Sequence, residues 1–429
     1  MLPFGTKDGS SESFDPSSIR RILVLILRPL GDTLFATPAL QALDLAYPEA
    51  SITVCCWPSS GALLQHNPHV DRIITCKHSL DLPRTLHELQ GEAIDMAVGL
   101  SHFGSWLLPL VRARFRVGFR SDELGWLYSV PVPDDRQVHA AQYCLEVVRA
   151  VGAPQVPLRL QIWVRPEERA EAAQILQTRG LAGYPVVAIH PGGHHFRGKR
   201  WSPEGFAQVA DALIDEKGVR VVLVGGDEDR ELAEEIRRRA RRPLVDLTGQ
   251  LNLRQTAALL QLCRLFIGND SGPLHIAEAV GTPVVAIFGP TNPANFAPLI
   301  EPSRLVRKDL CGPCIHWLEP GSLYFHSIRN PDCNFERIRQ VRRRSPSGKY
   351  RPARGCDHAH RHVLRQLPAL RQRRGPLHRD LHPRAPIPGA HRLHLRPRLP
   401  QPGPGRARGL PRPLHPDALP PGVHPGHSL

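Results

Sequence analysis

Long apolar runs are missing from this 429-residue chain. The longest strictly apolar run, Ile22 to Leu27, is far shorter than the roughly 20 residues that a membrane-spanning helix needs. The first 18 residues are polar and contain no apolar centre of a secretory leader. The nine cysteines show no regular pairing. These absences argue against an integral membrane protein and against a secreted disulfide scaffold, and we expect a protein of the reducing cytoplasm.

An excess of positive charge is also missing from most of the chain. The formal net charge is +15, but residues 341–429 alone carry 18 Arg and 1 Lys against 3 Asp and no Glu. The first 340 residues hold 36 basic and 37 acidic side chains. Since a nucleic-acid-binding fold needs a basic surface, we expect no nucleic-acid partner for this part.

Apolar runs of strand type alternate with helical segments from residue 19 to residue 336, which is typical of α/β folds with parallel sheets. We predict one Rossmann-like, doubly wound domain over residues 19–175 and a second over residues 176–336, facing each other across a cleft that forms the ligand site. Residues 1–18 are predicted to be a disordered leader. The first strand is expected to end at a turn, Pro29 to Asp32.

The stretch GNDSGPLHIAEAVGTPVVAIFGPT, residues 268–291, has the pattern of a phosphate-binding turn. A short apolar strand precedes it and a helical segment follows it, so Asp270, Ser271 and Gly272 lie in a strand-to-helix turn. The first N–H groups of a helix have no partner within the helix and bind anions at the positive end of its dipole. Asp270 or Ser271 can cap this helix, Gly272 permits close approach, and His275 adds a donor.

The strand VVAIF that follows this helix ends in a second small turn, which contains Gly289 and Thr291. Two neighbouring strand ends therefore present small polar turns, and open parallel sheets bind ligands at such ends. An ordinary capped helix with tight turns is the alternative interpretation.

Four arginines lie near the middle of the first unit, in VRARFRVGFR: Arg112, Arg114, Arg116 and Arg120. Spacing by two on a strand places side chains on one face, where guanidinium groups can hold an anionic substrate. The alternative is a solvated edge strand.

Three stretches in this order resemble glycosyltransferase family 9, the ADP-heptose:lipopolysaccharide heptosyltransferases: RILVLILRPLGDTLFATPALQAL, HPGGHHFRGKRW and GNDSGPLHIAEAVGTPVVAIFGPTNP. The resemblance covers roughly residues 20–335. It implies a GT-B architecture of two Rossmann-like domains, with the nucleotide sugar held mainly by the C-terminal one. It also implies inversion at the anomeric carbon without a metal or other cofactor.

The resemblance identifies Asp32 as the general base. A carboxylate near a helix N-terminus stays ionised and can accept the proton of an attacking hydroxyl, although it can also simply cap the helix. Lys199 is similar to the lysine that neutralises the leaving diphosphate, a role that a point charge can fill. The remaining donor-binding residues implied are Asp227 and Glu228 for the ribose, and Asp270, Ser271, Gly272, His275, Gly289 and Thr291 for the nucleotide-sugar turns.

The implied activity is transfer of heptose from ADP-heptose to the inner core of lipopolysaccharide. The implied acceptor is a lipid A-core molecule. The four arginines then become acceptor contacts, and the protein is expected at the cytoplasmic face of the inner membrane as a peripheral protein. Two alternatives remain: a family member with another nucleotide sugar or acceptor, and a catalytically impaired nucleotide-binding protein.

Two regions depart from the family pattern. Cys311, Cys314 and Cys333 form part of a zinc-site pattern but have no obvious fourth ligand, and we expect no metal. Residues 337–429 form a basic tail, with 17 prolines and 10 histidines after residue 340, that is too polar to bury a core. This tail is either a disordered basic arm for membranes or nucleic acid or, as we favour, the product of a shifted reading frame in a GC-rich gene. Resequencing the gene around codons 320–345 tests the frameshift.

Overall fold

The computed structural model describes residues 15–307, except 78–80, 82–84, 86–92, 101–104, 123, 136, 194–198 and 290. Residues 1–14 of the predicted leader 1–18, the three late cysteines and the tail 337–429 therefore lie outside the described residues. The end of the leader is described, and Pro16–Ser18 form a short 3-10 helix.

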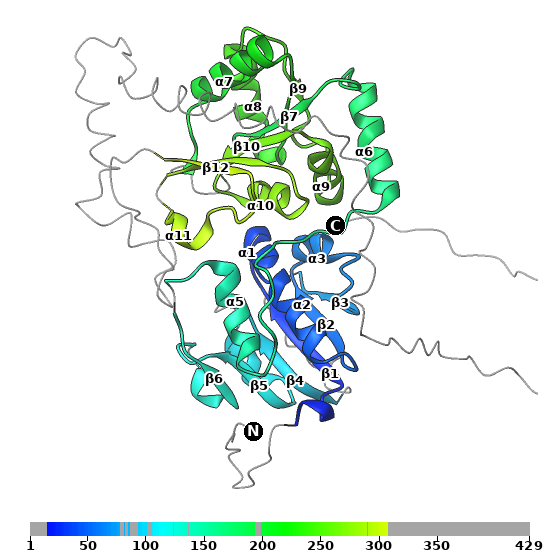
Figure 1. Ribbon diagram of the computed structural model, residues 1–429, viewed down its shortest axis with the longest axis vertical. Coiled ribbons are helices and arrows are strands. Elements are labelled where there is room, and N and C mark those ends of the chain that lie inside the picture. The colour runs from blue at the N-terminus through cyan, green and yellow to red at the C-terminus, as the bar shows by residue number, and fades with distance from the viewer. Residues whose placement is uncertain are drawn as a thin grey trace, which may run out of the picture. The chain divides into compact units, whose positions relative to one another are not determined.

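The first half of the described chain forms a six-stranded parallel sheet with the order β3-β2-β1-β4-β5-β6 (Figure 1). Its strands are β1 (Arg21–Ile26), β2 (Ser51–Cys56), β3 (Arg72–Thr75), β4 (Ile94–Gly99), β5 (Ala113–Phe119) and β6 (Val130–Val132). The strand order reverses between β1 and β4. In an open parallel sheet, ligands bind beyond the carboxyl ends of the strands at such a reversal.

The second half repeats this topology in another six-stranded parallel sheet, with the order β12-β11-β10-β7-β8-β9. Its strands are β7 (Val186–His190), β8 (Arg220–Leu223), β9 (Val245–Asp246), β10 (Leu265–Asn269), β11 (Val284–Phe288) and β12 (Ser303–Arg307). Here the order reverses between β7 and β10. The two Rossmann-like sheets predicted from the sequence are therefore both present.

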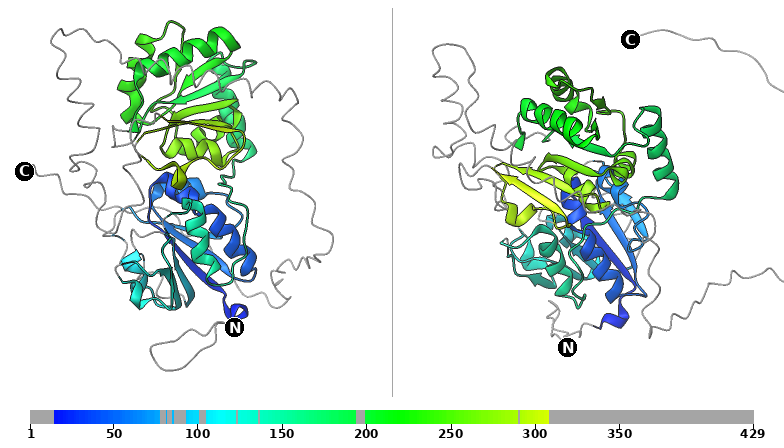
Figure 2. Two further views of the ribbon diagram at one scale, coloured as in Figure 1. Left: turned by 60° about the vertical axis from the view of Figure 1, so that its left-hand side comes forward. Right: turned by 45° about the horizontal axis from the view of Figure 1, so that its top comes forward.

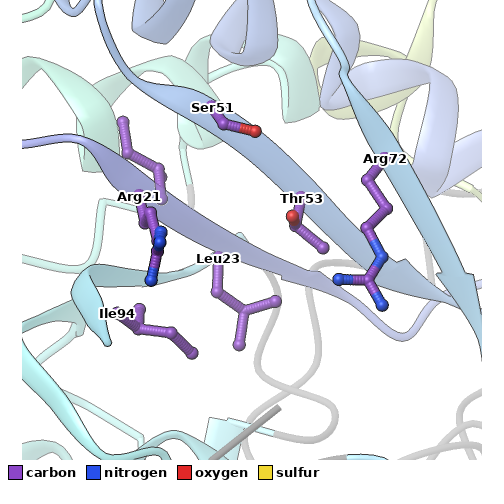
Figure 3. Close-up of a pocket in the computed structure, with 7 residues that line it drawn as sticks. Arg21, Leu23, Ser51, Thr53, Arg72 and Ile94 are labelled. Atoms are coloured by element: carbon purple, nitrogen blue, oxygen red, sulfur yellow. The ribbon is translucent and has the colours of Figure 1, made fainter. Parts of the chain in front are cut away.

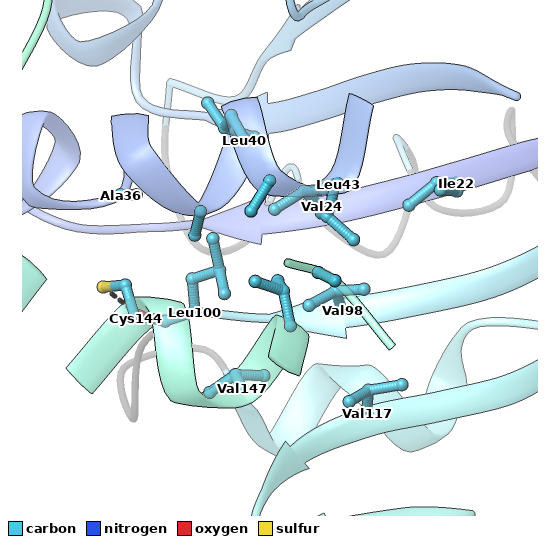
Figure 4. Packing of buried hydrophobic residues seen from close by; sticks show 14 of the residues in the cluster. Ile22, Val24, Ala36, Leu40, Leu43, Val98, Leu100, Val117, Cys144 and Val147 are labelled. Carbon is cyan, nitrogen blue, oxygen red and sulfur yellow. Dashed lines mark hydrogen bonds between the residues drawn. The ribbon is translucent and has the colours of Figure 1, made fainter. Parts of the chain in front are cut away.

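Helices cover the sheets because the strands are apolar on both faces. The helices are α1 (Leu30–Phe35), α2 (Thr37–Ala46), α3 (Pro58–Leu64), α5 (Ala140–Arg149), α6 (Pro166–Thr178), α7 (Pro203–Lys217), α8 (Arg230–Arg239), α9 (Leu253–Leu262), α10 (Gly272–Ala279) and α11 (Pro293–Phe296). Leu40 and Leu43 of α2 and Val147 of α5 pack against Val24 and Val98 of the first sheet (Figure 4). In the second sheet, α7 and α8 cover one face, and α9 and α10 cover the other (Figure 2).

The residues after β1 differ from the prediction. The expected turn over Pro29 to Asp32 is instead the start of the short helix α1, in which the Thr33 N–H donates to the Pro29 carbonyl. A glycine inside a helix normally costs stability. Packing explains the glycine at position 31, because a Cβ atom there would lie 3.0 Å from Cδ2 of His275 on α10. The glycine thus lets the two helices approach closely.

Helix α6 packs against α9 in the second half of the chain, and the predicted domain boundary at residue 175 falls inside it. Arg254 on α9 donates from Nε to the carboxylate of Glu168 on α6 at 2.9 Å. This hydrogen bond is the main cause that lowers the pKa of Glu168 to about 2. The last helix before β7 is thereby tied to the second sheet.

Candidate functional site

Polar residues gather where neighbouring strands of the second sheet end. His190 ends β7, Asn269 ends β10, and the segment Asp227–Asp229 follows β8. Gly289 and Thr291 follow β11. Since parallel strands end at the same edge, these residues lie beside the order reversal between β7 and β10, where the ligand of a Rossmann-like sheet binds.

The turn after β10 forms as the sequence predicts. Ser271 is the N-cap residue of α10, with extended backbone, and its side chain makes no capping hydrogen bond. The Asp270 N–H donates to the Ile287 carbonyl at 3.1 Å, which fixes the turn on the neighbouring strand. The first N–H groups of α10 are thus not covered by their own cap side chain, as an anion-binding turn requires.

Behind this turn lies a buried cluster of charges. The Lys199 ammonium donates to Asp270 Oδ2 at 2.7 Å. Nε2 of His275 lies 3.8 Å from Asp270 Oδ1, and its Nδ1 lies 3.2 Å from Glu278 Oε2. Both ring nitrogens of His275, expected as ligand donors, therefore face carboxylates of the protein itself.

The contacts within the cluster favour the charged forms of Asp270 and His275. Burial acts to raise the pKa of Asp270, but the hydrogen bonds and charges of His275 and Lys199 outweigh it and hold that pKa far below its usual range. Burial acts to lower the pKa of His275, but the two carboxylates raise it to about 9. At neutral pH, Lys199 and His275 thus provide two positive charges beneath the turn.

Asn269 connects the loop that follows β7 to this turn. Its Nδ2 donates to the carbonyls of Pro191 and Gly192 at 2.8 and 2.9 Å, and its Oδ1 accepts from the Trp201 N–H. The loop that carries Lys199 is therefore held at both ends by one amide side chain. Sequence reasoning missed Asn269, as it missed His190 and Asp229, although a polar residue at the end of a buried strand is a usable signal.

Asp32 lies on α1, and α1 packs against α10, the helix that follows the turn at Asp270 and Ser271. A Cβ atom added at position 272 would lie 3.2 Å from Leu30 of α1, and one added at position 31 would lie 3.0 Å from His275. The Phe35 ring packs edge-on against the His275 ring at a centroid distance of 4.6 Å. The Asp32 side chain is 25% exposed and pairs with Arg28 Nε at 3.6 Å. The carboxylate that the sequence singles out is thus partly open to solvent, on a helix that packs against α10.

The other predicted donor residues lie at the same strand ends but differ in exposure. The Asp227 side chain is 81% exposed and pairs with Arg230 at 2.8 Å, and Glu228 beside it is also exposed. Thr291 is buried, and its hydroxyl has no hydrogen-bond partner within the described residues. Gly289 is exposed in the turn after β11. Two exposed acids, one of them paired with Arg230, and one buried hydroxyl therefore follow the strands that end around the turn.

The four arginines are not brought together. Arg114 donates to Ser18 Oγ at the amino end of the first sheet. Arg116 donates to the carbonyl of Val111, just before the strand that carries it. Burial lowers the pKa of Arg116. Arg112 is exposed just before β5, whereas Arg120 is exposed just after it, at the carboxyl end. Of the four arginines, Arg120 alone lies at the carboxyl ends of the strands, as Asp32 does.

A separate pocket lies at the opposite edge of the first sheet (Figure 3). Arg21, Ser51 and Arg72 begin their strands there, and Leu23, Thr53 and Ile94 complete the lining that Figure 3 labels. Because Asp32 follows the carboxyl end of β1, this pocket is not part of the candidate site.

Comparison with known sequences identifies the family. Residues 83–321 match the profile of glycosyltransferase family 9 (heptosyltransferase). The chain belongs to glycosyltransferase family 9. It is 30% identical over 308 residues to lipopolysaccharide heptosyltransferase 2 of Escherichia coli (strain K12), covering 66% of this chain and 87% of that protein. It is 29% identical over 312 residues to lipooligosaccharide heptosyltransferase 2 of Haemophilus ducreyi, covering 66% and 88%.

Solved structures support the fold expected of family 9. A family 9 glycosyltransferase from Veillonella parvula matches with a TM-score of 0.65 at 23% identity, covering 83% of this chain and 98% of that chain. ADP-heptose lipopolysaccharide heptosyltransferase II of E. coli matches with a TM-score of 0.60 at 24% identity, covering 75% and 98%. The GT-B fold class predicted from the sequence is confirmed, and the protein is a glycosyltransferase.

Proposed function

We propose that this protein transfers heptose from ADP-heptose to the core of lipopolysaccharide, with inversion at the anomeric carbon. Membership of family 9 and the names of its relatives support the substrates. The observation that carries the mechanism is the packing of α1 against α10, with Gly31 on His275 and Leu30 on Gly272. Because Asp32 follows Leu30 and Gly31 on the same helix, we take its carboxylate to act beside the turn proposed to hold the diphosphate.

Asp32 is the general base in this proposal. It accepts the proton of an acceptor hydroxyl as the hydroxyl oxygen attacks the anomeric carbon of the heptose. The bond from that carbon to the diphosphate oxygen breaks, and its electron pair leaves with ADP. Attack on the face opposite the leaving group inverts the anomeric centre. The partial exposure of Asp32 leaves it open to an incoming acceptor.

The departing ADP is stabilised by charges that already stand in place. The ammonium of Lys199 has three N–H donors, so its bond to Asp270 leaves others for a phosphate oxygen. The N-terminus of α10 and the Ser271 hydroxyl add donors at the turn, and Thr291 adds a hydroxyl on the neighbouring one. Asp227 or Glu228 binds the ribose hydroxyls. With these groups, transfer proceeds without a metal or other cofactor.

We place the reaction at the cytoplasmic face of the inner membrane, where the protein binds a lipid A-core acceptor as a peripheral protein. The residues that the structure describes include no helix long and apolar enough to pass through a bilayer. Arg120, exposed at the carboxyl edge of the first sheet, is the arginine best placed for an anionic acceptor.

Thermal unfolding with ADP, UDP, GDP and CMP tests the donor. A ligand present at about 100 times its Kd adds roughly 2.7 kcal/mol to the free energy of unfolding. We expect stabilisation by ADP alone, and we expect ADP-heptose to release ADP only when acceptor is present. Stabilisation by another nucleotide would overturn the donor assignment. Release of ADP that does not depend on acceptor would overturn the transferase reaction.

A further inference from the structure

Three side chains, from the end of β7 and from the segments that follow β8 and β10, form one hydrogen-bonded chain at the turn before α10. Ser271 Oγ lies 3.2 Å from Nδ1 of His190, and Nε2 of His190 lies 3.2 Å from Asp229 Oδ2. His190 and Asp229 are each 3% exposed, whereas Ser271 is partly exposed at the N-cap of α10. The chain therefore runs from the protein interior to the site proposed for the diphosphate.

The backbone is shaped to hold the Asp229 carboxylate at the inner end of this chain. A Cβ atom at position 192 would lie 2.2 Å from Asp229 Oδ1, so a larger residue there would displace the carboxylate. The Gly226 N–H donates to Asp229 Oδ2 at 3.2 Å. Within the described residues, Asp229 Oδ1 has no hydrogen-bond partner. A buried carboxylate held this way has His190 as its main polar partner.

The ionised carboxylate decides where His190 carries its protons. Burial acts to raise the pKa of Asp229, but the hydrogen bond and charge of His190 lower it below its ordinary value. Nε2 of His190 therefore carries a hydrogen and donates to Asp229. Nδ1 then has two states: it accepts a hydrogen bond when the ring is neutral and donates one when the ring is protonated.

These two states direct the single hydroxyl hydrogen of Ser271 differently. With neutral His190, the hydroxyl donates inward to Nδ1, and Oγ turns its lone pairs toward an approaching phosphate, which repels it. With protonated His190, Nδ1 donates to Oγ and the hydroxyl hydrogen is free. It then donates to the Asn269 carbonyl, 3.1 Å away, or outward to a phosphate oxygen.

We propose that His190, held by Asp229, is a positioning residue that takes up a proton when the donor's diphosphate binds and thereby turns the Ser271 hydroxyl toward the phosphate. This inference rests on the proposed function, because it takes the α10 turn as the diphosphate site. It predicts that donor binding weakens as pH rises, although neither His190 nor Asp229 touches the ligand.

Other charged groups surround the chain and must be separated from it. Arg200 contributes a positive charge near Asp229, and Lys199 and Asp270 form an ion pair on the other side of Ser271. The same loop carries His194 and His195, which lie outside the described residues. Variants of these two histidines therefore serve as controls for a pH effect.

The test measures the Kd of ADP-ribose by calorimetry between pH 6.5 and 8.5, in buffers of different ionisation enthalpy. ADP-ribose is a suitable probe because its diphosphate is a diester and does not titrate in this range. We expect wild-type affinity to fall about fivefold to tenfold over this interval, with proton uptake at neutral pH, as for one linked site. His194→Asn and His195→Asn should keep this slope.

Two sets of variants separate positioning from structure. His190→Asn should bind ADP-ribose with the weak affinity that wild type shows at pH 8.5, at every pH. Ser271→Ala should do the same, whereas Ser271→Thr, which keeps the hydroxyl, should restore the pH dependence. Because Ser271 is partly exposed, its variants test the inference even if His190→Asn fails to fold, which melting temperatures would show.

The outcomes distinguish this inference from the proposed function. If wild type does not bind ADP-ribose or ADP at any pH, the donor assignment fails. If wild type binds but its affinity does not depend on pH, or if Ser271→Ala keeps the full slope and proton uptake, the positioning role of His190 is overturned while the donor assignment stands.

Discussion

The two carboxylates at the centre of the site, Asp32 and Asp270, lie in opposite surroundings. Asp270 is 6% exposed and is held by Lys199 at 2.7 Å with His275 behind it. Asp32 is 25% exposed, and its described ion pair is a 3.6 Å contact with Arg28 four residues earlier. The side proposed to hold the donor is thus fixed by contacts within the protein, whereas the carboxylate proposed to meet the acceptor is accessible. This suits a transferase whose leaving group needs fixed charge and whose base must reach an incoming hydroxyl.

The cost of each arrangement follows from burial. A buried charge is stable only while its partners remain, because losing one partner leaves the other charged and desolvated. A partly exposed carboxylate keeps water as an alternative partner, and such surface ion pairs contribute little to stability. Substitutions should therefore affect folding on the donor side and catalysis alone at Asp32.

The largest effect is expected at Asp32. Asp32→Asn should lower kcat by about 10² to 10⁴, because the amide cannot accept the acceptor's proton. The Kd of ADP and the midpoint of urea unfolding should stay close to wild type. Steady-state kinetics with ADP-heptose and a lipid A-core acceptor measure the loss. Near wild-type turnover would remove Asp32 from the role of base.

Asp270→Asn, in contrast, should lower the stability of the folded protein. The amide leaves the charges of Lys199 and His275 without their shared carboxylate, so we expect the free energy of unfolding to fall by about 3 kcal/mol or more. Asp227→Asn is the matched control, since Asp227 is 81% exposed and its loss should cost less than about 0.5 kcal/mol. Urea unfolding measures both. Equal, small losses would contradict the buried character of the cluster.

The pH dependence of stability should report His275. Its pKa in the folded protein is about 9, above the ordinary value of 6.5, so its contribution is complete below pH 6.5 and is lost as pH rises toward 9. By this linkage, the loss is on the order of 3 kcal/mol. The His275→Gln variant should lack this loss, and groups that titrate in both proteins cancel in the difference. Parallel curves of unfolding free energy against pH would show that His275 is not held as an imidazolium.

The smallest effect is expected on the acceptor side. Arg120→Ala should raise the KM of the acceptor about fivefold to tenfold and leave that of ADP-heptose unchanged, because one exposed charge is lost at the edge of the sheet that holds Asp32. Arg114→Ala removes the same charge at the other end of β5 and should leave both constants unchanged. If Arg114 and Arg120 behave alike, the sheet edge does not select the acceptor.

Local patterns were enough to predict much of the fold. The buried strands are continuous apolar runs, and the turn at Asp270 and Ser271 is marked by an apolar strand before it and a helix after it, so both could be placed from sequence alone. Helix α1 was missed because Pro29 and Gly31 are turn residues by propensity. Its packing against His275 overrides that preference, and such a contact over more than 240 positions leaves no local signal.

The candidate site shows the same limit. The resemblance to family 9 pointed to Asp32 and Lys199, but the partners that hold Lys199 and order the turn depend on which strand ends are neighbours. The chain of Ser271, His190 and Asp229 joins the ends of β10 and β7 with the turn after β8, and only the strand order brings these together. The arginines do not come together because Arg114 lies near the start of β5 and Arg120 follows its end.

The contact between Gly31 and His275 also has an evolutionary consequence. A side chain at position 31 would press against an imidazole 244 positions later, so the size of residue 31 is limited by residue 275. A lineage that enlarges position 31 must shift or replace the imidazole at position 275, and replacing it would remove the buried cation near the turn proposed to hold the diphosphate. In related chains that keep histidine at position 275, we therefore expect glycine at position 31.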